Sequence, residues 1–228
     1  MRDVLPFHRR HAPPLQSGIG SASHATEVAS AFFRSMEFWK ICRALNNEIR
    51  LSLLREIATS PNRELHVVQA GEFVGLKKAA ASQYLKQLAE AGFLSVERTG
   101  RYVICSGEPE KASPVYKLQM VLARLFAASC ELDWQKPLLN TINAFAHHVR
   151  IRILQSLSAR ARCGFEELAK ATDLPFATLR RQFGLLIAAQ IVATCDAPDG
   201  HRIYELGKPS APLARTLLAL ALQLQSPS

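Results

Sequence analysis

The sequence of 228 residues lacks the features that mark several classes of protein. No stretch approaches the roughly 20 consecutive apolar residues of a membrane span, and the N-terminal region has no apolar run long enough for a signal peptide. The five cysteines are scattered and never form a CxxC pair, which argues against a disulfide framework or a zinc knuckle. These absences predict a cytoplasmic protein.

Signatures of catalysis are missing as well. The chain has no glycine-rich phosphate loop, no HExxH, no nucleophile elbow and no evident carboxylate pair, so we expect no enzymatic activity and no cofactor. His147 and His148 are adjacent, and adjacent helical residues point about 100° apart, so we expect no metal site there. What is present is positive charge, a net +9 at pH 7. This charge fits a polyanionic partner such as DNA, and equally a basic protein without one.

The chain contains an internal repeat. ALNNEIRLSLL (residues 44–54) aligns with AFAHHVRIRIL (144–154), and LKQLAEAGFL (85–94) aligns with FGLLIAAQIV (183–192). The elements follow in the same order in both copies, which indicates one structural unit used twice.

A stretch rich in Pro, Gly and charge, SGEPEKASP, separates the two copies. The predicted organisation is a disordered basic arm (1–25), a first unit (26–112), and a second unit (113–228) that ends in a C-terminal helix.

Each unit has the pattern of two helices, a short helix, a further helix and a β-hairpin, followed by a long amphipathic helix. In the first unit the short helix is expected over residues 65–75, and the next begins near Lys77 with Ala81, Leu85 and Leu88 toward the core. The fold class is therefore mainly α with small hairpin wings, a tandem winged helix-turn-helix. In that architecture the last core helix enters the DNA major groove.

Three segments of the first unit carry a family resemblance: FWKICRALNNEIRLSLL, LHVVQAGEFVGLKKAAASQYLKQLAEAGFL and ERTGRYVI. They resemble the ArsR family of bacterial winged-helix regulators. The resemblance implies a homodimer that represses transcription and releases DNA when a metal or other effector binds. The family's paired cysteines on the third helix and its Asp/His/Glu sets on the terminal helix are not present here, so the metal-sensing role is not carried over.

Fusion of two units also departs from the family, which usually has one unit per chain. Dimeric winged-helix repressors join through their first and last helices, and this chain contains both twice, at about 26–45, 113–132, 136–146 and 210–225. We expect these four helices to pack together as an intramolecular pseudo-dimer, which would suit an asymmetric operator. A monomeric pseudo-dimer and a homodimer of such chains both remain open.

The residues expected to contact DNA lie on the third core helix and the hairpin of each unit. Lys77 and Lys78 begin a helix, where the dipole already favours phosphate. Gln83 suits adenine, Tyr84 can reach a phosphate, and arginines at a hairpin tip suit phosphate or a narrow minor groove. The full predicted set is Lys77, Lys78, Gln83, Tyr84, Arg98, Arg101, Thr178, Arg180, Arg181, His201 and Arg202.

Several alternatives stay open. Arg50 and Arg150 recur in one slot and fit either a phosphate contact or a partly buried ion pair, with Glu90 as a candidate partner for Arg50. Cys42 and Cys130 are expected to be buried small hydrophobes, although a redox switch is the competing interpretation.

The whole chain has alternatives too. It could be a winged-helix protein-interaction scaffold without DNA readout, with the divergent second unit as the docking surface. A regulator could also bind an unknown small-molecule effector between its terminal helices.

Overall fold

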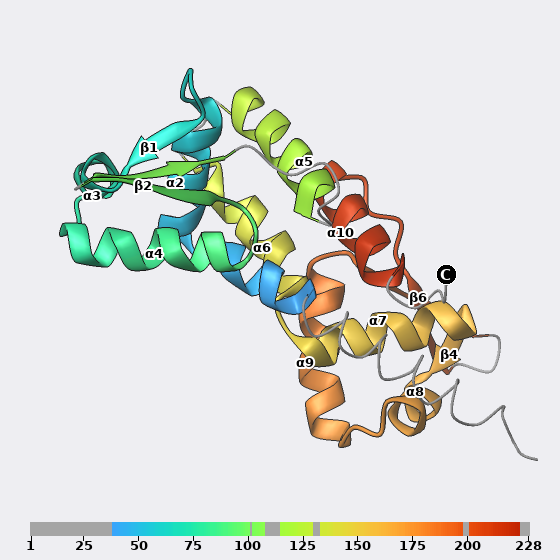
Figure 1. The fold of residues 1–228 in the computed structure, drawn as a ribbon. Helices are drawn as coiled ribbons and strands as arrows, with labels where there is room; N and C mark the ends of the chain where they lie inside the picture. The colour runs from blue at the N-terminus through green and yellow to red at the C-terminus, as the bar shows by residue number, and fades with distance from the viewer. Residues whose placement is uncertain (1–37, 101, 108–114, 130–132, 198–200, 224–228) are drawn as a thin grey trace, which may run out of the picture.

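The computed structural model describes residues 38–100, 102–107, 115–129, 133–197 and 201–223. The predicted basic arm lies outside these residues. The described chain is mainly helical and contains two small three-stranded antiparallel sheets (Figure 1).

The first half begins with helical residues 38–45. The elements that follow are α2 (Glu48–Thr59), β1 (Glu64–His66), α3 (Val67–Val74), α4 (Lys78–Glu90), β2 (Ser95–Thr99), β3 (Tyr102–Ser106) and α5 (Val115–Ala128). The strand order is β1-β3-β2, and the β2–β3 hairpin turns at Gly100, whose φ is +61°.

The second half repeats this order of elements. They are α6 (Gln135–Phe145), α7 (His148–Arg160), β4 (Arg162–Gly164), α8 (Phe165–Thr172), α9 (Phe176–Ala188), β5 (Val192–Asp196), β6 (Arg202–Leu206) and α10 (Pro212–Gln223). The strand order is β4-β6-β5, the same arrangement as in the first half.

Strands β1 and β4, which add a third strand to each hairpin, were not predicted from the sequence. The predicted pattern has no strand between the second helix and the short helix of a unit, but β1 and β4 lie there. The short helix α3 begins at Val67 and not at Leu65, because Leu65 is buried in β1 opposite Cys105 of β3. Strands of three residues are too short to show an alternating pattern in sequence.

The second helix of each half starts with the same kind of cap. The side-chain oxygen of Asn47 accepts a hydrogen bond from the backbone N–H of Arg50 at 3.0 Å. At the equivalent position, Nδ1 of His147 accepts from the N–H of Val149 at 3.2 Å. Each side chain satisfies one of the N–H groups that a helix start leaves unpaired.

The third core helix of each half also ends in the same way. After α4, Gly92 has a φ of +82°, and after α9, Gln190 has a φ of +58°. In both places the next residue closes the turn: Phe93 N–H donates to Leu88 at 2.9 Å, and Ile191 N–H donates to Leu186 at 3.0 Å. A left-handed residue closing a helix in this way favours glycine, so the second half uses a less suitable residue for the same turn.

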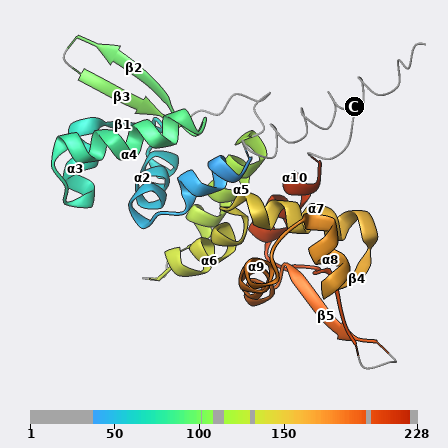
Figure 2. The same cartoon turned by 90° about the horizontal axis from the view of Figure 1, so that it is seen from below.

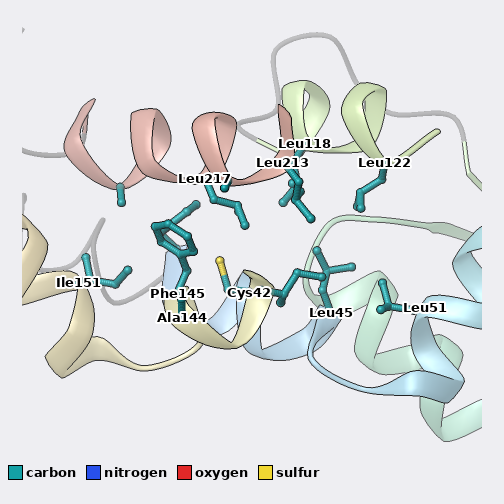
Figure 3. Close-up of a cluster of buried hydrophobic side chains, with 14 of the residues drawn as sticks. Cys42, Leu45, Leu51, Leu118, Leu122, Ala144, Phe145, Ile151, Leu213 and Leu217 are labelled. Carbon is teal, nitrogen blue, oxygen red and sulfur yellow. The ribbon is translucent and has the colours of Figure 1, made fainter. Parts of the chain in front are cut away.

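The two halves share one hydrophobic core. Helix 38–45, α5, α6 and α10 meet at the junction, where α10 packs against both α5 and α6 (Figure 3). Cys42 lies fully buried among them, and the ring of Phe38 meets that of Phe145 edge-on at 6.5 Å. In the described residues, helix 38–45, α5, α6 and α10 therefore contribute to one common interior.

Candidate nucleic-acid interface

The helices α4 and α9 lie on either side of helix 38–45 and α6. In Figure 1, α4 runs along the lower edge of the first half and α9 lies along the second half, with the blue helix 38–45 between them. The view from below in Figure 2 shows the β2–β3 and β5–β6 hairpins extending toward opposite ends of the molecule.

The start of α4 presents two lysines to solvent. Lys77 is the N-cap residue and Lys78 the first helical residue, and both side chains are exposed. The opposite face of the helix is anchored, because Ala81, Leu85 and Leu88 are at most 1% exposed, as predicted. A rigidly held helix start with two cations is an arrangement that favours binding of an anion.

Two other predicted residues of α4 differ in their placement. Gln83 is exposed and available on the outer face. Tyr84 was also expected to point outward, but it is half-buried and packs against the core. Its ring lies near the guanidinium of Arg50, so its position on the helix brings it toward α2 and away from the outer face.

The first hairpin places Arg98 on the exposed surface of β2, in register with Val103. The second predicted arginine, Arg101, lies outside the described residues. Tyr102, which sequence analysis did not select, is 52% exposed and its ring lies 6.3 Å from that of His66. Successive residues of a strand point to opposite faces, so the alternation of Tyr102 with Val103 could have identified Tyr102 as an outward-facing residue.

The start of α9 differs in chemistry from that of α4. Pro175 is the N-cap residue, and Phe176 follows with 56% of its surface exposed, 5.6 Å from the ring of Phe165. Thr178 is half-buried, whereas Arg180 and Arg181 are exposed. The positive charge therefore comes one turn later on α9 than on α4.

The second hairpin has less free positive charge than the first. His201 and Arg202 are both exposed, as a DNA-contacting role requires. The guanidinium of Arg202, however, lies 3.9 Å from the carboxylate of Asp196 on the paired strand. Both partners are well exposed, so this ion pair is weak.

Arg50 does not pair with Glu90, which corrects the ion-pair interpretation. Arg50 donates to the backbone carbonyls of Ala44 and Arg43 and to the side-chain oxygen of Gln87. Glu90 instead lies 3.6 Å from Lys86 on its own helix. The guanidinium thus meets the carbonyls that end helix 38–45, where the helix dipole favours a cation.

Arg150 makes the equivalent contacts in the second half and is more deeply buried. It donates to Ala144 at 3.1 Å, to the carbonyl of Asn143, and to Gln182 of α9 at 2.8 Å, and is 5% exposed. Burial lowers the pKa of both arginines. Arg50 thus ties helix 38–45 and α2 to α4, and Arg150 ties α6 and α7 to α9. Arg150 is therefore not available to phosphate.

Two hollows bear on the expectation of an effector. A shallow groove lies between α5 and α10, lined by residues such as Tyr116, Arg124 and Leu220. A second cavity of about 30 Å³ lies between α2 and α5, where the side-chain oxygen of Gln119 has no partner while its Nε2 donates to Phe93 at 2.7 Å. That volume suits a water and is too small for an organic effector.

The cysteines are mostly interior. Burial strongly raises the pKa of Cys42, and it raises that of Cys105 to about 11. Cys42 is therefore a protonated thiol in the shared core, in line with the expected role of a small hydrophobe, while Cys130 lies outside the described residues. Within the described ranges, no three His, Cys, Asp or Glu side chains gather in a group that could hold a metal ion.

Comparisons with protein-family models, curated proteins and solved structures return no match to this chain. Among the described residues, no helix combines the length and apolarity needed to cross a membrane.

Proposed function

We propose that this protein is a DNA-binding transcriptional regulator, acting most simply as a repressor in the cytoplasm. In this proposal each half is a winged helix-turn-helix, with α4 and α9 entering the major groove and the two hairpins contacting the flanking backbone. The chain works as a single-polypeptide pseudo-dimer and needs no cofactor.

The observation that carries the proposal is the exposed cationic start of α4. Lys77 and Lys78 stand at the N-terminus of a helix whose opposite face is fixed in the core, with the exposed Arg98 on the adjacent hairpin. Phosphate contacts from lysine, arginine and helix N-termini are the usual means of positioning a protein on DNA. The shared core of helix 38–45, α5, α6 and α10 supports the pseudo-dimer, because it holds both units in one body.

The test is a titration of the full chain against a labelled duplex of mixed sequence, at several salt concentrations. Six phosphate contacts would weaken binding by about 10³-fold between 50 and 200 mM salt. The double variant Lys77→Ala/Lys78→Ala should lose much of the affinity and the salt dependence. Lys117→Ala/Lys208→Ala is the matched control, since it removes the same charge from exposed positions on α5 and after β6. Binding that ignores salt, or equal losses in the two double variants, would contradict the proposal.

A second candidate function is a protein-interaction scaffold, and one observation favours it. On α9, Phe176 is 56% exposed, Leu185 39% and Ile187 38%, which is unusual apolar exposure for a helix that should face DNA. A hydrophobic interface would keep its affinity when salt is raised, so the same titration, performed with a captured protein partner, separates the two functions.

A further inference from the structure

A contiguous cluster of aromatic and cationic side chains bridges the two halves, between α4 and α9. The guanidinium of Arg43 lies 5.6 Å from the ring centre of Trp39, and that ring lies 5.9 Å from His148. His148 in turn stacks on His147 at 4.7 Å with an angle of 19° between the rings. We call these four residues, together with Arg181 of α9, the seam cluster.

The seam cluster gathers positive charge at the surface, because Arg43 and Arg181 are both exposed. Within the part of the chain that the structure describes, neither Arg43 nor Arg181 forms an ion pair with a carboxylate. The pKa of His147 is lowered by its partial burial and by the charges of Arg150, His148, Arg181 and Arg43, in that order. Like charges held together repel one another, and a bound anion relieves that repulsion.

The seam cluster is continuous with the region beside α4. Arg43 also lines a groove that contains Lys40 and Arg50 and reaches the last turn of α4. The carboxylate in this groove, Glu90, is 3.6 Å from Lys86. Cations therefore extend from the end of α4, across helix 38–45, to α9.

The internal repeat places a second, equivalent group of positions on the opposite flank of the junction between the halves. The residues at those positions differ in charge from the seam cluster. There, Asn143 stands in place of Arg43, Asn47 in place of His147, and Glu48 in place of His148. Asn143 and Asn46 meet across the junction at 3.3 Å, and Gln135 donates to Ser52 at 2.6 Å. The cations of this flank are engaged: Arg55 lies 4.6 Å from the ring centre of Trp134 and donates to the carbonyl of Ser129 at 2.7 Å, and Lys136 pairs with Asp133 at 2.6 Å. Its charge is therefore compensated in a way that the seam cluster's is not.

We propose that the seam cluster binds a backbone phosphate of duplex DNA at the middle of the bound segment, between the segments contacted by α4 and α9. The inference rests on the proposed DNA-binding function and adds to it a third point of contact. Because the contact exists on one flank only, it fixes the direction in which the chain lies on a duplex, independently of the base contacts of the two third helices.

The experiment measures the salt dependence of binding to a labelled mixed-sequence duplex of about 24 base pairs, which spans two half-sites one helical turn apart. Arg43→Asn copies Asn143 of the opposite flank, and His148→Glu copies Glu48 of that flank and adds a negative charge. Arg160→Asn is the control, an exposed arginine at the far end of α7. Thermal melting monitored by circular dichroism establishes that each variant is folded.

Loss of one phosphate contact should make the slope of log K against log salt shallower by about one in Arg43→Asn. His148→Glu should weaken binding further, and Arg160→Asn should leave the slope unchanged. If Arg43→Asn and His148→Glu match the control while Lys77→Ala/Lys78→Ala still loses affinity, DNA binding stands and the seam contact is overturned. If the wild-type protein does not bind the duplex at low salt, both proposals fall together.

Discussion

The two halves of this protein use the same framework with different residues. Each half ties three of its helices together through an arginine, half-buried in the first half and buried in the second, that meets two helix-ending carbonyls and a glutamine. The arginine occupies the same slot in both halves, but its glutamine partner does not: Gln87 lies near the end of α4, whereas Gln182 lies in the middle of α9. Both halves therefore give the guanidinium a glutamine acceptor, although the glutamine comes from a different position of the helix.

The outer surfaces of the halves have diverged much further than the interiors. The start of α4 carries Lys77 and Lys78, while the start of α9 carries Pro175 and the exposed Phe176. The two halves nevertheless have the same order of helices and strands and the same sheet topology. Three groups of substitutions test whether the two halves also share the energetics of the arginine ties, the helix-ending turns and the helix caps.

The largest expected effect concerns the two arginines. Arg150→Met should lower the free energy of unfolding by about 3 kcal/mol, because it leaves buried carbonyls and Gln182 without a donor. Arg50→Met should cost less, about 1 kcal/mol, since Arg50 is only half-buried and water can replace it. Urea unfolding of both variants measures this difference, with Arg160→Met as an exposed control. Equal losses at the two positions would show that burial does not distinguish them.

An intermediate effect is expected at the turns that end α4 and α9. Gln190→Gly should stabilise the protein by about 0.5–1 kcal/mol, because it relieves a left-handed backbone, and Gly92→Ala should destabilise it by about 1 kcal/mol. Gly184 in α9 is the matched control: an added Cβ there meets nothing within 4 Å, so Gly184→Ala should stabilise by about 1 kcal/mol. Thermal melts give all three signs, and a destabilising Gln190→Gly would contradict the account of the turn.

The smallest effect concerns the caps of α2 and α7. Burial and neighbouring cations lower the pKa of His147 in the folded protein below its ordinary value, so the folded state favours the neutral ring. That preference stabilises the fold above the unfolded pKa of about 6.5 and is lost as the pH falls through the folded pKa.

His147→Asn, which copies the cap of the first half, removes this term. Its free energy of unfolding should fall less than that of the wild type between pH 8 and pH 5. The other histidines are present in both proteins, so the difference between them reports His147. Parallel pH profiles would show that the ring titrates as an ordinary exposed histidine.

Sequence periodicity predicted the helices, the hairpins and the core face of α4, because side chains of one type repeat along each of these elements. It missed β1 and β4, whose three residues offer no period to detect. It also considered only a phosphate or the carboxylate of Glu90 as partners for Arg50, because sequence patterns show side-chain charge but not the carbonyl groups that a neighbouring helix leaves unpaired.

The candidate site was predicted unevenly for a similar reason. Lys77, Lys78 and Gln83 lie at exposed positions of α4, as its helical period indicated. Tyr84 does not, because a large ring can turn toward a neighbouring helix from the border of an exposed face. The seam cluster was not anticipated, because it joins Arg43 to residues more than a hundred positions away, through a contact that only the packing of the two halves creates.

The core shared by helix 38–45, α5, α6 and α10 has a consequence for assembly. Two separate chains that meet through such helices dissociate on dilution and can exchange partners with related chains. Here both sides belong to one polypeptide, which holds them at an effective concentration in roughly the millimolar range, whatever the number of molecules present. The two halves of the described chain therefore stay joined at any dilution.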